Sequence, residues 1–277
     1  MWYKLKRIMM RPNGVEKQVR PSTPIWNWDL TKATLASSVS VTWYLIYGVA
    51  MSDDGTKFYY ATNNWNSTAA TFHQFTLTTP FDISTRTNEV TFDFGSSSAT
   101  WWVYPFNIVF RENWEYLYLS YLNSGAPLYW EKYTLSTPRD VSTSTLSQQI
   151  SLISGPTNGS LYISNDGTKM WTLGTGIYYK DLSTPFTLEA WTLIDNWTYP
   201  FGTFSSDWKY VYTDNWNTIA QYSLTTPRDI TTASQIATLT KTSGSYWYWI
   251  YFNRDGTKLR TVRWSVNGQN IYTYEIS

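Results

Sequence analysis

The chain repeats one short motif five times, and this repetition restricts its possible folds more than any other feature. The motif reads SDDGTKFYY at 52–60, and related segments follow at 110–119, 164–173, 205–213 and 253–262. Equivalent positions in consecutive copies lie 58, 54, 40 and 49 residues apart. A period of this length with strand-like units indicates a β-propeller or a similar array. Residues shared by the copies are therefore expected to be scaffold, and function is expected where the copies differ.

Each repeat divides into four strands. A nearly continuous apolar run predicts an inner strand buried on both faces. In three copies an Asp-Gly turn follows, which supplies the positive φ that a tight hairpin needs. Copies two and four have Asn113-Trp114 and Asp207-Trp208 there instead, so those turns are predicted to differ in detail. A Ser/Thr-Thr-Pro triplet then separates the third strand from the fourth, because proline fixes φ and cannot donate to a ladder.

The two ends of the chain complement each other. The segment 270–277 matches a third strand, and the missing turn and fourth strand are found at 22–37. Joining them gives one complete blade and removes an open sheet edge. We therefore predict an all-β, five-bladed β-propeller with four-stranded blades over 22–277, closed by its N-terminal strand, with a separate arm at 1–21.

Composition agrees with a β fold. Aromatic residues make up 19% of the chain, with 17 Trp and 23 Tyr, which is typical of strands. No run of eighteen apolar residues occurs, so no membrane span is predicted. The first ten residues mix basic with apolar positions and lack a small-residue cleavage site, so no signal peptide is predicted. The absence of cysteine excludes disulfides and thiolate metal sites and fits assembly in a reducing cytoplasm.

The two motifs, DGTK-[MF]-Y and QY-x-L-[ST]-T-P-x-D-[IV]-[ST]-T, resemble those of a β-propeller family found in tailed bacteriophages and related bacterial genomes. The resemblance spans the repeats at 39–277, and the third copy departs from it, with Thr187 in place of Asp. It implies a location in the virion, after assembly in the host cytoplasm, or at a cell surface. It does not fix a function, since one fold serves many. The matching positions are Asp54–Thr56, Thr79, Pro80, Asp82, Thr137, Pro138, Asp140, Asp166–Thr168, Thr184, Pro185, Thr226, Pro227, Asp229 and Asp255–Thr257.

Catalytic chemistry finds little support. Glycoside hydrolysis needs a carboxylate pair, and the five predicted inner strands contain no Asp or Glu. The single histidine, His73, and the lack of cysteine argue against a triad or a zinc site, so His73 is given a surface or packing role. We predict no enzyme, cofactor or metal; a calcium site at Asp53 and Asp54 is unnecessary, because turn aspartates usually bind their own backbone. The turn acids are Asp53, Asp54, Asp82, Asp140, Asp166, Asp207, Asp229 and Asp255.

Aromatic residues gather in the loops predicted for one propeller face. These rings stand among Asn, Asp and Ser, a combination that suits a sugar, whose apolar face stacks on the ring while amides and hydroxyls bind its OH groups. The same rings would suit a protein interface or could simply cover blade edges. Basic residues are too few there for nucleic acid. The candidate binding residues are Trp65, Tyr121, Trp216 and Trp264 at the blade tips, and Trp102, Trp197 and Trp247 nearer the hub.

The arm at 1–21 is strongly basic and lies outside the repeat. Its first twenty residues carry six basic side chains against Glu16, a net charge of +5, around a predicted Asn13-Gly14 hairpin turn. An isolated hairpin is marginal in water, so the arm is expected to rest on the propeller or on another virion protein. A solvated tail is the alternative. The basic residues are Lys4, Lys6, Arg7, Arg11, Lys17 and Arg20.

Together these features favour a non-enzymatic structural or adhesin-like protein of a tailed-phage virion. In that hypothesis the propeller is displayed outward, where it could meet a host-surface glycan, and the arm docks to other virion proteins. The alternative is a free-standing glycan-binding lectin. A lectin has no use for the arm, so the arm distinguishes the two.

Overall fold

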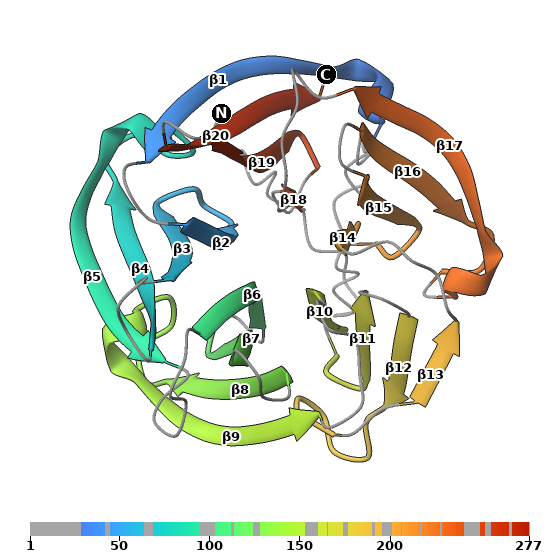
Figure 1. The fold of residues 1–277 in the computed structure, drawn as a ribbon, viewed down its shortest axis with the longest axis horizontal. Coiled ribbons are helices and arrows are strands. Elements are labelled where there is room, and N and C mark those ends of the chain that lie inside the picture. The colour runs from blue at the N-terminus through green and yellow to red at the C-terminus, as the bar shows by residue number, and fades with distance from the viewer. Residues whose placement is uncertain are drawn as a thin grey trace, which may run out of the picture.

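The structure is a computed structural model. The residues that it describes are 29–41, 45–63, 69–94, 103–111, 114–123, 128–152, 160–164, 166–173, 177–189, 192–195, 201–205, 207–215, 218–227, 229–240, 250–252, 256–265 and 268–276. They form five four-stranded antiparallel sheets, arranged as blades in a ring (Figure 1). The predicted five-bladed propeller is confirmed. None of the described helices is long and apolar enough to cross a membrane.

The strands follow one another outward from the hub in each blade. Blade 1 contains β2 (Leu45–Met51), β3 (Lys57–Asn63), β4 (Ala70–Leu77) and β5 (Arg86–Phe94). The other complete blades repeat this order. Blade 2 has β6 (Val103–Arg111), β7 (Tyr116–Asn123), β8 (Leu128–Leu135) and β9 (Ser144–Leu152); blade 3 has β10 (Ser160–Ile163), β11 (Lys169–Leu173), β12 (Ile177–Asp181) and β13 (Thr192–Asp195); blade 4 has β14 (Phe201–Phe204), β15 (Tyr210–Asn215), β16 (Thr218–Leu224) and β17 (Ala233–Thr240).

Blade 5 is shared between the two ends of the chain. It contains β18 (Ile250–Phe252), β19 (Lys258–Ser265) and β20 (Gly268–Ile276), with β1 (Ala33–Val41) as its outer strand. The pairing of β1 with β20 is antiparallel and runs from Ala33 opposite Ile276 to Val41 opposite Gln269. The predicted ring closure is therefore confirmed (Figure 1). The arm at 1–21 lies outside the described residues.

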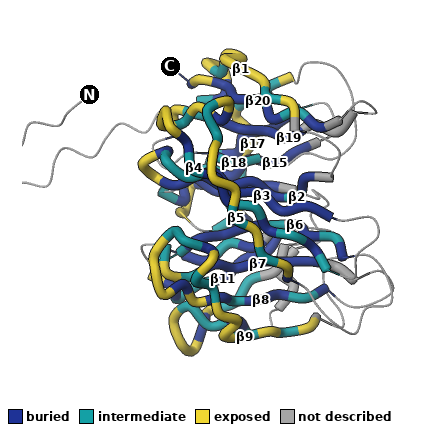
Figure 2. The backbone as a smooth tube through the Cα atoms, turned by 90° about the vertical axis from the view of Figure 1, so that its left-hand side faces the viewer, coloured by how far each residue is buried: buried dark blue, intermediate teal, exposed yellow. Residues whose placement is uncertain are grey.

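Burial separates the inner strands from the outer ones. The second strand of blade 1 is buried along almost its whole length, whereas the outer strands β5 and β17 alternate between exposed and half-buried residues (Figure 2). This is the pattern expected when inner strands pack on both faces and outer strands border solvent. Clusters of buried apolar side chains fill the spaces between neighbouring blades, so the ring is held together by interfaces between blades.

The hairpin turns after the inner strands share one conformation despite their different residues. Gly55 and Gly167 have φ of +71° and +69°, and Trp114 and Trp208 occupy the same position with φ of +70° and +60°. The prediction that the tryptophan turns would differ is thus wrong for the backbone. The reason lies in packing: Trp208, for example, is buried against Phe204 with ring centroids 4.8 Å apart, and this burial can offset the cost of a left-handed backbone.

At Gly55 and Gly167, the ring of a phenylalanine from the Thr-Pro turn packs against the glycine. An added Cβ on Gly55 would lie 2.5 Å from Cδ2 of Phe81, and one on Gly167 the same distance from Cδ2 of Phe186. Both phenylalanines follow a Thr-Pro pair and have positive φ themselves. In blade 2, by contrast, Trp114 fills the turn. The scaffold therefore places an aromatic side chain at this point by two different routes.

Similar polar contacts join three pairs of neighbouring blades. The Tyr59 hydroxyl donates to the Arg139 carbonyl at 2.9 Å, and the Tyr118 hydroxyl donates to the Phe186 carbonyl at 2.8 Å. In blade 5 the equivalent position of β19 is Arg260, whose Nη2 donates to the Phe81 carbonyl at 3.3 Å. These contacts link second strands to the Thr-Pro turns of the neighbouring blades.

A second set of contacts between blades uses glutamine side chains. Their Oε1 atoms accept hydrogen bonds from backbone N–H groups just after the Thr-Pro turn of the next blade. The three contacts are Gln74 with Val141 N at 2.9 Å, Gln148 with Leu188 N at 2.8 Å, and Gln221 with Leu30 N at 3.0 Å.

Candidate functional site

The acidic residues recur in the turns and are missing from the described inner strands at the hub. Over their described residues, the five inner strands β2, β6, β10, β14 and β18 carry no Asp or Glu. In the hairpin turns, Asp54 Oδ1 accepts from the Ser52 hydroxyl at 2.6 Å and from the Thr56 N–H at 3.0 Å. Asp166 and Asp207 make the same contacts in their own turns.

The aspartates of the Thr-Pro turns cap short 3₁₀ helices. Asp82, Asp140 and Asp229 each accept from the N–H two residues later, at the start of η2 (Ile83–Thr85), η3 (Val141–Thr143) and η4 (Ile230–Thr232). The predicted turn role is confirmed for these side chains and for Asp54, Asp166 and Asp207. Asp53 is an exposed turn residue, and Asp255 lies outside the described residues. No group of His, Asp or Glu suited to a metal ion occurs within the described ranges.

His73 packs within blade 1. Its ring stacks on Tyr60 with centroids 4.6 Å apart, and its nitrogens lie 2.8 Å from Thr62 Oγ1 and 2.6 Å from Glu89 Oε1. Burial lowers the pKa of His73, although the Glu89 carboxylate opposes this effect. The predicted packing role of His73 is confirmed.

Most of the predicted aromatic face cannot be placed. Trp65, Trp102, Trp197, Trp216 and Trp247 lie outside the described residues. The backbone of Trp264 belongs to β19, but its side chain is not among those described. The prediction for these positions stays open.

Tyr121 does not project from a blade tip, as the sequence had suggested. Its side chain is 1% exposed, its ring stacks on Tyr129 at 5.4 Å, and its hydroxyl donates to Glu131 Oε1 at 3.0 Å. Tyr133 and Gln149 donate to the same buried carboxylate at 2.6 and 2.8 Å. Burial, and then the charge of Glu131, raise the pKa of both tyrosines, which stay protonated as donors. The cluster is closed and structural.

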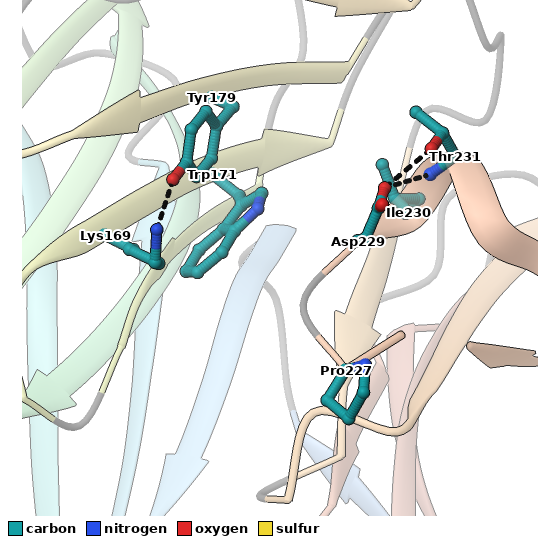
Figure 3. A pocket seen from close by; sticks show the side chains of 7 residues that line it. All are labelled: Lys169, Trp171, Tyr179, Pro227, Asp229, Ile230 and Thr231. Atoms are coloured by element: carbon teal, nitrogen blue, oxygen red, sulfur yellow. Dashed lines mark hydrogen bonds between the residues drawn. The ribbon is translucent and has the colours of Figure 1, made fainter. Parts of the chain in front are cut away.

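A pocket opens between blades 3 and 4. Its volume is about 460 Å³, within the roughly 300–1,000 Å³ range of small-molecule sites. Figure 3 shows two walls: one formed by β11 and β12, and one by the Thr-Pro turn and η4 of blade 4. Its lining residues are Lys169, Trp171, Tyr179, Pro227, Asp229, Ile230 and Thr231.

The pocket lies where the described residues do not make one contact that other blade interfaces have. Gln74 and Gln221 stand opposite Tyr59 and Tyr212 in their sheets, and each reaches the next blade. At the equivalent place in blade 3 the residue opposite Trp171 is Tyr179. Its hydroxyl turns instead to Lys169 and Asp181 on its own blade.

The opposite wall consequently keeps a free donor. Ile230 is the residue whose N–H corresponds to that of Val141, which Gln74 binds. Among the described residues, none accepts from the Ile230 N–H. The missing bridge leaves both space and an unused backbone donor between the two blades.

Lys169, Tyr179 and Asp181 form a fixed polar group at one wall. Lys169 Nζ donates to the Tyr179 hydroxyl and to Asp181 Oδ1, both at 2.5 Å, and the Tyr179 hydroxyl donates to Asp181. Hydrogen bonding to Asp181 raises the pKa of Lys169, and the same contact lowers the pKa of Asp181. Burial raises the pKa of Tyr179. The group is therefore an ion pair holding a neutral phenol, with the Tyr179 ring locked in place.

The back of the pocket is an indole. Trp171 is 1% exposed and packs on Trp208 with centroids 4.5 Å apart. Figure 3 shows its ring nitrogen on the side that faces Asp229, and no described residue accepts from it. Asp229 binds Thr231 N and Oγ1 through Oδ1, at 3.1 and 2.6 Å, so no described donor occupies Oδ2.

Comparison with known proteins adds only to the description of the fold. No protein-family model matches the sequence, and no curated protein matches it. A functionally unknown protein from Desulfotomaculum acetoxidans DSM 771 is 11% identical, with a TM-score of 0.40 over 80% of this chain and 67% of that chain. The periplasmic gluconolactonase of Pseudomonas aeruginosa is 12% identical, with a TM-score of 0.47 over 78% of this chain and 64% of that chain. Likeness at this level bears on neither activity nor ligand.

Proposed function

We propose that this chain is a non-enzymatic, adhesin-like recognition protein of a tailed-phage particle, with the propeller as its binding module and residues 1–21 as its docking arm. One observation carries the binding role: the scaffold contact found at three blade interfaces is not made by the described residues between blades 3 and 4, where a pocket lies. The resemblance of the repeat motifs to phage propellers supports the virion setting.

The test compares wild type with a full-length variant carrying Lys4→Glu, Lys6→Glu and Arg7→Glu. Particles are purified at low and at high salt, and the protein is quantified in them by mass spectrometry. Incorporation of the variant should fall, and wild-type attachment should weaken as salt rises, because exposed charges are screened over about 10 Å at 0.1 M salt. Circular dichroism checks that the variant retains its β fold. Normal incorporation of the variant, or absence of the wild-type protein from particles, would contradict the virion assignment.

The free-standing lectin is the second candidate. The aromatic and polar lining of the pocket favours it as much as it favours an adhesin. Purified protein should then bind host cells or their glycans whether or not particles contain it. Binding of wild-type protein to cells, measured by flow cytometry with a fluorescent label, tests the recognition role that both candidates share. A protein that binds no host cell would contradict that shared role.

A further inference from the structure

The pocket between blades 3 and 4 offers a preorganised aromatic platform. The Tyr179 ring is tilted against Trp171 with centroids 5.4 Å apart, and its hydroxyl is held by Lys169 and Asp181. A ring held at its edge and at its hydroxyl loses little freedom when a ligand stacks on it. Such preorganisation reduces the entropic cost of binding.

Around this platform lie donors and acceptors that have no hydrogen-bond partner among the described residues. The Trp171 indole N–H and the Ile230 backbone N–H can donate, and Asp229 Oδ2 can accept. Unpaired polar groups at a concave apolar site are the features that orient a bound small molecule. A ligand rich in hydroxyls satisfies both kinds of group at once, because each hydroxyl donates one hydrogen bond and accepts others.

The charges of the pocket disfavour an anionic ligand. Lys169 is the one cation among the described lining residues, and it is neutralised by Asp181. Asp229 stands on the other wall, and no described cation forms an ion pair with it. The described residues of the lining, together with Asp181, therefore carry about one net negative charge. An acidic sugar would bring a second carboxylate toward Asp229, at an unfavourable distance for like charges.

We infer that this pocket binds a neutral sugar ring, stacked on Tyr179 and hydrogen-bonded to Trp171 and Asp229. This inference rests on the proposed recognition function and names the ligand class and the place of binding. The site lies between two blades at the ends of strands that carry the hairpin and Thr-Pro turns. Its described lining includes neither Trp65 nor Trp216.

The sequence repeat itself supplies the decisive variant. Tyr179→Gln puts at this interface the side chain that Gln74 and Gln221 use to bind the neighbouring blade. The new glutamine can accept from the Ile230 N–H, so the variant should fold while losing the platform. Tyr179→Phe is the matched control, since it keeps the ring and removes only the hydroxyl. Asp229→Asn keeps an Oδ1 acceptor for Thr231 and removes the negative charge.

The full-length proteins are titrated with methyl glycosides of glucose, galactose and N-acetylglucosamine and with glucuronic acid, by ligand-observed NMR and isothermal titration calorimetry. Wild type should bind at least one neutral glycoside and bind glucuronic acid more weakly. Tyr179→Gln should reduce affinity roughly ten- to hundredfold, by analogy with the stacking of bases on aromatic side chains. The affinity of Tyr179→Phe for the neutral glycoside should stay within about threefold of wild type. Asp229→Asn should reduce the difference in affinity between neutral and acidic sugars.

Several results would overturn the inference. Equal affinity of wild type and Tyr179→Gln would place the site elsewhere, and tighter binding of glucuronic acid would refute the charge argument. If Tyr179→Gln does not fold, Asp229→Asn still tests the site: an unchanged preference for neutral glycosides over glucuronic acid in this variant would refute it. Cell binding by a protein that binds none of these sugars would refute the ligand class while leaving the recognition function intact. Sugar binding by a protein that binds no host cell would support the ligand class and refute the recognition function.

Discussion

Gly55→Ala tests how tightly the hairpin turns are specified. Gly55 has φ of +71°, and an added Cβ would lie 2.5 Å from Cδ2 of Phe81. The left-handed backbone costs a non-glycine residue about 1–2 kcal/mol, and inserting a methyl group into a packed site costs about 1–3 kcal/mol more. The Phe81 ring is half-buried and can yield somewhat, so we expect a loss of about 2–4 kcal/mol in the free energy of unfolding.

Thermal unfolding followed by circular dichroism measures this loss, which should lower Tm by roughly 5–12 °C in a chain of this size. Gly48→Ala is the control: its φ is +64°, but its nearest side-chain contact is Ile108 Cγ1 at 3.2 Å, so mainly the backbone cost remains. Phe81→Ala combined with Gly55→Ala should recover the steric part. If Gly48→Ala costs as much as Gly55→Ala, or if the double variant shows no recovery, the proposed clash with Phe81 is wrong.

Three further predictions concern acid stability, ring closure and the loop face. Burial opposes ionisation of Asp54, but hydrogen bonds from Ser52 and Thr56 and the charge of Arg139 outweigh it and lower its pKa to about 2. Its contribution to stability is therefore present above about pH 4 and is lost as the pH falls toward 2, so the Tm difference between wild type and Asp54→Asn should shrink over that range. Deleting 268–276 leaves β1 unpaired and should cause aggregation, visible by light scattering; a soluble, normally melting product would contradict the closure. Trp65→Ala and Trp216→Ala should weaken binding to host cells without changing Tm if the loop face also binds ligand, and unchanged binding would remove that face from consideration.

The sequence predicted the fold well because the repeat carries local and global information together. Thr-Pro and Asp-Gly pairs mark turns through their own backbone preferences, with no help from distant residues. The ring closure followed from counting strands, and the register from Ala33 to Val41 agrees with it. Turn aspartates were also predictable, since their partners lie within a few residues in sequence.

The features that the sequence did not reveal depend on side-chain packing between residues that are far apart in the sequence or on different strands. Tyr121 looked like a loop residue, but it ends in a buried cluster because Glu131 and Gln149 approach it from neighbouring strands. The tryptophan turns looked unlike the glycine turns, although burial of Trp208 compensates for its backbone conformation. Local patterns give no measure of such compensation.

The sequence contains a difference at the pocket whose meaning becomes clear only with the structure. The third strand of blade 3 ends in KDL where two other copies have QFTL and QYSL, and this difference puts Tyr179 in the place that glutamine takes in those two copies. Without the contact between Gln74 and Val141, the absence of glutamine at this position has no obvious consequence. Function does lie where the copies differ in this hypothesis, but the relevant difference is one residue in a strand.

The position of the pocket also bears on how the protein would be displayed. Ala33 begins β1 opposite Ile276, whose N–H binds the Thr257 carbonyl in the turn before β19. The chain therefore enters the propeller at the turn face, the same face on which Lys169 and Asp229 flank the pocket. The strand ends at Asn63 and Asn215, which pair with Ala70 and Thr218, lie away from this turn face. Variants at Tyr179 test binding at the turn face, and Trp65→Ala tests the sequence-based prediction for the loop that follows Asn63. Together they reveal which of the two candidate sites meets the host.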